Sequence, residues 1–139
     1  MDNINQRLLK KAEDLGVNIE FVEMERSGIY LSKIKTIFLS QSIIDTDKES
    51  FSLSHELGHN IKEHEKYKEY YYATTSSRGK MEREANQVAI EILLELYLHE
   101  YNIESEQLNP VLFMEKFNIS SHLENYVIDC MKKYYVETL

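Results

Sequence analysis

The most informative segment of this chain is Phe51-Ser52-Leu53-Ser54-His55-Glu56-Leu57-Gly58-His59, because it predicts both a helix and its chemistry. At about 100° per residue, His55 and His59 lie one turn apart on the same face of a helix. Apolar side chains occupy the opposite face of that helix: Leu53, Leu57 and Ile61. The pattern therefore predicts a helix with a core side and a ligand side, and Gly58 leaves room for another segment to approach closely.

Two imidazoles in this arrangement can hold one zinc ion at Zn–N distances of about 2.0–2.1 Å. Glu56 lies beside the ligand face, where its carboxylate can accept a proton from a water activated by the metal. The motif predicts His55 and His59 as zinc ligands and Glu56 as the general base. The alternative is a helix with two solvated histidines, against which the opposed leucine face and Gly58 both argue.

A third ligand is expected, because a catalytic zinc site usually has three protein ligands and one open position. The helix predicted at 80–100 offers Glu82, with Asn86 one turn later on the same face, where it can hydrogen-bond a ligand histidine. Glu84 is the alternative third ligand, and all of these can instead be ordinary residues of a first helical turn. His64 would turn towards the core side of a continued helix, which favours a structural histidine. Spacing alone leaves the choice between Glu82 and Glu84 open.

The remaining pattern predicts an α+β fold, with a small antiparallel sheet of about three strands packed on a helical body. In this arrangement the zinc site lies between the two helices that carry the motifs. Helices are expected at 4–15 (ended by Gly16), 48–65 and 80–100, with a last helix opened by Ser121 and Glu124. Strands are expected at 17–21, 29–31 and 36–39, a loop at 65–80, and a break at Asn109-Pro110.

Length, net charge and cysteine count limit the classes of function and the cellular compartment that the sequence is compatible with. The length of 139 residues predicts one domain over 1–139, and the net charge of −8 argues against direct binding of nucleic acid through phosphates. Cys130 is the single cysteine, so no internal disulfide can form and a reducing, cytoplasmic compartment is expected. The sequence contains no signal-peptide pattern and no apolar run of about 20 residues that would span a membrane.

The motifs together resemble the ImmA/IrrE family of bacterial and phage zinc metallopeptidases. Residues 51–59 are similar to the family's HELGH block, and Glu82-Arg83-Glu84-Ala85-Asn86-Gln87-Val88-Ala89 is similar to its ExxAN helix. The strand at 36–39 precedes the motif, and Phe117-Asn118-Ile119-Ser120 resembles the segment before a terminal helix. The resemblance extends over about residues 29–135.

This resemblance implies a gluzincin-like site with His55, His59 and Glu82 as zinc ligands and Glu56 as base. It favours Glu82 over Glu84, because the family's glutamate stands three residues before the alanine. It also implies a partner, an HTH-type transcriptional repressor of a phage or mobile element, which is cleaved or counteracted. Candidates for stabilising the oxyanion are the following: His64, Tyr70, Tyr71 and Tyr72.

Three functional hypotheses follow. The first is a zinc endopeptidase that binds a repressor segment along a sheet edge and cleaves it. The second is a non-catalytic anti-repressor in which zinc is structural and the acidic surface masks a basic partner. The third is a toxin-type partner of an antitoxin regulator. The sequence does not indicate an oligomeric state.

Overall fold

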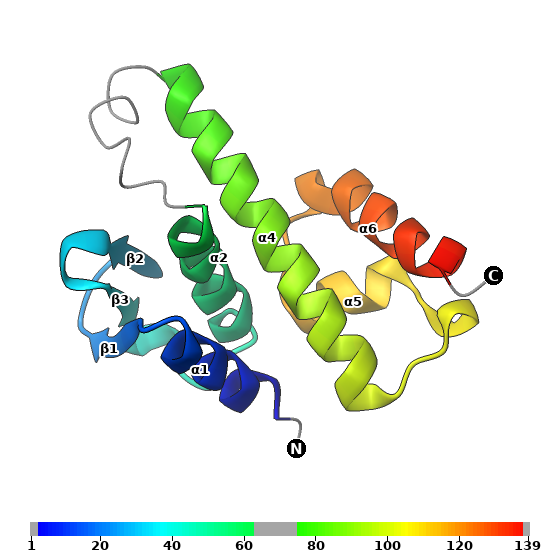
Figure 1. The fold of residues 1–139 in the computed structure, drawn as a ribbon, viewed down its shortest axis with the longest axis horizontal. Coiled ribbons are helices and arrows are strands. Elements are labelled where there is room, and N and C mark those ends of the chain that lie inside the picture. The colour runs from blue at the N-terminus through cyan, green and yellow to red at the C-terminus, as the bar shows by residue number, and fades with distance from the viewer. Residues whose placement is uncertain (1–2, 63–74, 138–139) are drawn as a thin grey trace.

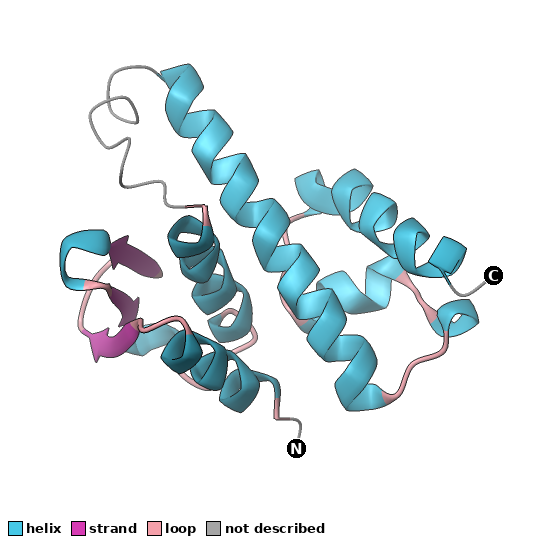
Figure 2. Ribbon diagram, in the orientation of Figure 1, coloured by secondary structure: helices cyan, strands magenta, loops and turns pink. Residues whose placement is uncertain are grey.

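One long helix, α4 (Thr75–Tyr101), divides the molecule into two parts (Figure 1). The computed structural model describes residues 3–62 and 75–137. One part contains α1 (Ile4–Asp14), β1 (Asn18–Val22), β2 (Gly28–Leu31), β3 (Thr36–Ser40) and α2 (Glu49–Ile61). The other contains α5 (Pro110–Lys116) and α6 (Glu124–Glu137). The strands all lie on the α2 side of α4, and the expected α+β class is confirmed (Figure 2).

The first helix follows its sequence pattern. Ile4, Leu8 and Ala12 are the buried residues of α1, spaced so that they share one face. Gly16 follows the helix with a φ of +73°, in the left-handed region where glycine carries no steric penalty. The predicted helix and its glycine ending are therefore confirmed.

The sheet has the strand order β1-β3-β2, and only one of its two pairings is antiparallel. Ile37 of β3 lies opposite Tyr30 in the antiparallel pairing with β2 and opposite Ile19 in the parallel pairing with β1. The prediction of an antiparallel sheet is thus wrong for β1 and β3. Strand β3 takes the centre, where four of its five residues are buried. Because the chain reverses direction at each connection, β1 and β3 then run the same way.

The two motif helices have different limits from those predicted. Helix α2 ends at Ile61 rather than at residue 65, with Lys62 as its C-cap. Helix α4 begins at Thr75, so the last part of the predicted 65–80 loop is helical. Leu53 and Leu57 are buried as expected, whereas Ile61 is 39% exposed because it stands in the last turn of the helix.

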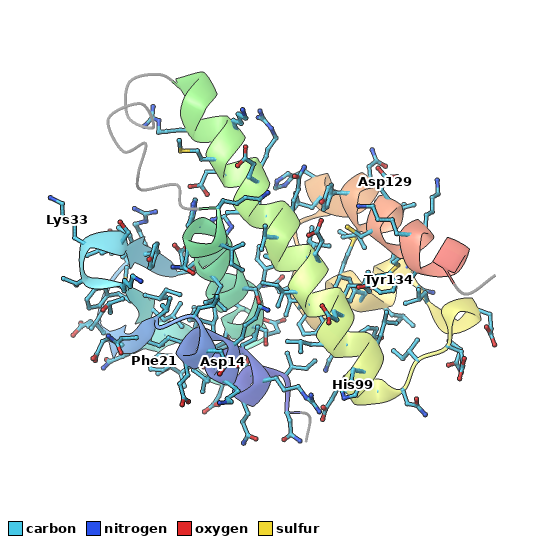
Figure 3. The ribbon with its side chains drawn as sticks, in the orientation of Figure 1. Asp14, Phe21, Lys33, His99, Asp129 and Tyr134 are labelled. Carbon is cyan, nitrogen blue, oxygen red and sulfur yellow. The ribbon has the colours of Figure 1, made fainter. Side chains whose placement is uncertain are left out.

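The C-terminal part contains a helix that was not predicted. Asn109-Pro110 was interpreted as a break, but the Asn109 side chain accepts hydrogen bonds from the backbone N–H groups of Val111 and Leu112 and opens α5. Before α6, residues Ser121–Leu123 form a 3-10 helix, so the α-helix begins at Glu124 rather than directly after Ser121. In Figure 3, Tyr134 lies on the inner side of α6 and Asp129 on its outer side.

A single cluster of buried side chains joins both parts of the molecule across α4. Fully buried members come from every layer, including Leu8 of α1, Leu57 of α2, Leu93 of α4 and Phe113 of α5. The lone cysteine, Cys130, is also buried within this cluster. Within residues 3–62 and 75–137, no helix combines the length and the apolar character needed to cross a membrane.

Candidate active site

Helices α2 and α4 approach each other so closely at Gly58 that no side chain fits between them. A Cβ at Gly58 would lie 2.6 Å from the carbonyl oxygen of Ala85 and 3.0 Å from its Cα. Ala85 and Ala89 are both fully buried. The close approach expected at Gly58 is confirmed, and it brings the polar face of α4 within reach of the histidines on α2.

The side chains of His55, His59 and Glu82 converge at this contact. His55 Nε2 lies 2.8 Å from Glu82 Oε2, and His59 Nε2 lies 3.3 Å from Glu82 Oε1. One ligand atom from each of the three residues lies within 4.8 Å of the others. Ligands about 2.0–2.2 Å from a tetrahedral zinc ion stand roughly 3.3–3.6 Å apart, so small adjustments would fit the three groups around one ion.

Asn86 sets the orientation of the His55 ring. The Nδ1–H group of His55 donates to the Oδ1 atom of Asn86 at 2.7 Å. This hydrogen bond keeps a proton on Nδ1 and leaves Nε2, which faces Glu82 Oε2 at 2.8 Å, as the nitrogen that would bind a metal in place of its own proton. The structure therefore places Asn86 where the sequence analysis expected it, one turn after Glu82 and against a histidine.

Glu56 is a buried carboxylate beside this cluster, and it is 7% exposed. Burial raises the pKa of Glu56, while the nearby imidazoles of His55 and His59 and the guanidinium of Arg26 act in the opposite direction. For His55, burial opposes protonation, but the hydrogen bond to Glu82 and the charges of Glu56 and Glu82 outweigh it and raise the pKa. The charge of each member of the group His55, Glu56, His59 and Glu82 therefore depends on the others.

The members of the cluster differ in their exposure to solvent. The side chains of His55 and His59 are 16% and 13% exposed, whereas that of Glu82 is 39% exposed. Of the three side chains, that of Glu82 therefore has the largest fraction in contact with solvent. Among the described residues, the group able to hold a metal contains Glu82 and not Glu84. The four oxyanion candidates, His64 and Tyr70 to Tyr72, lie outside the described residues.

Sequence reasoning missed the contribution of β2 to this site. The sequence pattern predicts a strand only from residue 29, whereas Gly28 is the first residue of β2 and lies against Glu56, with Arg26 two residues before it. The only signal in the sequence was a glycine at the edge of a short apolar segment, and such a glycine can mark a close approach as well as a turn. Which helix it approaches depends on the tertiary structure.

Two histidines one helical turn apart, a glutamate between them and a carboxylate from a second helix define the HExxH class of metal site. A family model described as the IrrE N-terminal-like domain, of the peptidase M78 family, matches residues 12–126. The chain belongs to this ImmA/IrrE family of metallopeptidases, as the sequence motifs indicated. Among the curated proteins compared, none matches the chain.

Proposed function

We propose that this protein is a zinc-dependent endopeptidase that cleaves an HTH-type transcriptional repressor. The observation that supports it most directly is the convergence of His55, His59 and Glu82 within 4.8 Å, with buried Glu56 beside them. Two neutral imidazoles and one carboxylate suit zinc, and this set leaves a fourth position for water or substrate. Family membership supports the same class of chemistry.

When bound, zinc would polarise the scissile carbonyl and make water a stronger nucleophile at neutral pH. Glu56 would accept the proton of the attacking water and deliver it to the nitrogen of the leaving amine. Its burial excludes bulk water, which strengthens its electrostatic interactions with the reacting groups. Asn86 would keep the His55 ring in the orientation that directs Nε2 towards the ion.

The substrate segment would lie along the outer edge of β2. In an antiparallel pair, alternate residues direct their N–H and C=O groups towards the partner strand. Ser40 N–H donates to the Ser27 carbonyl at 2.9 Å, so the backbone groups of residue 27 point towards β3. By alternation, the backbone N–H and C=O groups of Gly28 and Tyr30 point away from β3, towards the outer edge of the sheet. An extended peptide that pairs there would pass beside Glu56. The net charge of −8 suits a protein partner with a basic DNA-binding surface.

The first test measures zinc by elemental analysis in protein purified without a metal-affinity tag. Wild type is expected to hold about one zinc per chain, and His59→Ala and Glu82→Gln are expected to lose it. Glu84→Gln is the matched control for Glu82→Gln, because it makes the same chemical change two residues away. Well-folded wild type that takes up no zinc contradicts the proposal, and loss of zinc in Glu84→Gln with retention in Glu82→Gln reverses the ligand assignment.

The second test separates cleavage from binding. Glu56→Gln should keep its zinc and lose cleavage of the repressor, since the amide cannot accept the proton. Repressor fragments would be followed by mass spectrometry, alongside expression of a reporter under the repressor's control. Derepression by Glu56→Gln without fragments would instead establish a binding anti-repressor, and full cleavage by this variant would exclude Glu56 as the base.

A further inference from the structure

Gly28 lies where the sheet meets the buried side chain of Glu56. It is the first residue of β2, and it is buried. A Cβ at this position would lie 3.3 Å from the Cγ of Glu56, 2.9 Å from the Cδ2 of Leu39 and 3.2 Å from the carbonyl oxygen of Phe38. The strand therefore rests directly on the side chain of Glu56, and the absence of a side chain at Gly28 makes this possible.

The neighbours of Gly28 differ in how easily they can move. The Phe38 oxygen belongs to the backbone of β3, the central strand, which pairs on both sides. Leu39 is completely buried in the core, where a shift of its side chain displaces others. The Glu56 side chain borders the partly exposed cluster of candidate metal-binding groups. It is therefore the neighbour that can yield most easily to an added methyl group.

The strand itself is held against α2 at a second point. The Asn60 side-chain amide donates to the Tyr30 hydroxyl at 2.9 Å. Tyr30 follows Gly28 by two residues and Asn60 follows Glu56 by four, so both pairs lie on matching faces of the strand and the helix. Strand β2 thus contacts α2 at two points, Gly28 against Glu56 and Tyr30 against Asn60, and it also pairs with β3 through backbone hydrogen bonds. These contacts oppose any movement of β2 away from Glu56.

We propose that Gly28 is a positioning residue, which lets β2 confine the Glu56 side chain and hold its carboxylate in the orientation that proton transfer requires. This inference rests on the proposed function, because it gives Glu56 the role of base. Gly28 itself touches no substrate through a side chain. It fixes the base and the substrate-binding edge of the sheet relative to each other.

The test is Gly28→Ala, assayed on a fluorogenic peptide chosen from a library screen of cleavage by the wild-type holoenzyme. The kcat is expected to fall about 10- to 100-fold, because displacing a catalytic group by about 1 Å has effects of that size. The KM should change by less than about twofold, since a lost transition-state interaction lowers kcat and leaves substrate binding. Zinc content should stay at the wild-type value.

Two controls separate positioning from general destabilisation. Ile19→Ala weakens the sheet at β1, on the side of β3 opposite β2, and Gly79→Ala adds a methyl group whose nearest neighbour among the described residues is the end of the Arg83 side chain, at 3.3 Å. Both variants should keep kcat. If Gly28→Ala does not fold, Leu39→Val relieves the nearest clash, and Gly28→Ala/Leu39→Val is compared with Leu39→Val alone. An unchanged kcat in Gly28→Ala, or an equal loss in Ile19→Ala, overturns the proposal.

A second measurement does not depend on activity. Crystal structures of wild type and Gly28→Ala should show the Glu56 carboxylate displaced, with the side chains of His55, His59 and Glu82 in place. A carboxylate at its wild-type position overturns the positioning role. If wild type cleaves no peptide, the endopeptidase proposal fails, but these two structures still decide whether Gly28 positions Glu56.

Discussion

The two halves of α4 pack in opposite ways. Its N-terminal half meets α2 through Gly58 and Ala85, where a single added carbon would lie 2.6 Å from a backbone oxygen. Its C-terminal half meets α5 through aromatic rings, with the Tyr97 centroid 5.4 Å from that of Phe113 and 6.0 Å from that of Phe117. Small residues bring polar groups together in the first half, and large ones fill space in the second.

Because of this difference, the contact that sets the geometry of the site is not the contact that contributes most to the free energy of unfolding. Residues as small as Gly and Ala bury little apolar area, so the contact between α2 and α4 at these residues contributes little hydrophobic free energy. Buried aromatic rings contribute far more, through area and through specific ring contacts. Substitutions in the two halves are therefore expected to have different consequences.

The largest effect on stability is expected from Phe113→Ala. Phe113 is fully buried and packs edge-on against Phe117 at a centroid distance of 5.2 Å. Removing the ring should lower the free energy of unfolding by about 3–5 kcal/mol, through lost transfer energy and the cavity left behind. Urea denaturation measures the change, and zinc per folded chain should remain about one. If this variant does not fold, Phe113→Leu should give a smaller loss of stability. Loss of zinc in well-folded Phe113→Leu would show that the aromatic contact also determines the geometry of the site.

Gly58→Ala should have a smaller effect on stability but a direct effect on the site. The added Cβ must push the helices apart, which costs about 1–3 kcal/mol as overpacking. It also moves Glu82 away from the histidines, so zinc content measured by elemental analysis should fall below one per chain. The combination with Ala85→Gly should not restore zinc, because the nearest atoms of Ala85 belong to its backbone. Full zinc content in folded Gly58→Ala would show that the close approach does not determine the site.

The smallest expected change is a gain in stability. Ser54, one turn before Gly58, is fully buried, and its hydroxyl has no hydrogen-bond partner among the described residues. A buried polar group without a partner costs about 1–3 kcal/mol, so Ser54→Ala should raise the free energy of unfolding by roughly 1 kcal/mol. Thermal and urea unfolding measure the difference.

Ser50→Ala is the matched control for this change. Ser50 lies one turn earlier on the same face, and its hydroxyl donates to the Asn5 Oδ1 atom of α1 at 2.5 Å. The same substitution should therefore lower stability there, by about 0.5–1.5 kcal/mol. Destabilisation by Ser54→Ala would show that the Ser54 hydroxyl does have a partner in solution.

The elements that the sequence predicted well are those with a local cause. The spacing of Ile4, Leu8 and Ala12 encodes α1, and Gly16 ends it, because both depend on helix periodicity and backbone sterics. The helix of the HExxH motif was predicted for the same reason. Helix α5 was also encoded locally by Asn109 and Pro110, but its start signal was interpreted as a stop.

Local sequence patterns predicted the residue types of the candidate metal site, the α+β class and the buried faces of the main helices. Strand pairing depends on contacts between elements that are distant in the chain. The same contacts determine which glutamate lies beside His55 and His59, and which glycine contacts Glu56. Spacing left Glu82 and Glu84 open, since the choice depends on how α4 is rotated against α2. That rotation is set by the contact between Gly58 and Ala85, 27 residues apart in the chain. Periodicity describes each element alone, whereas the site arises from packing between elements.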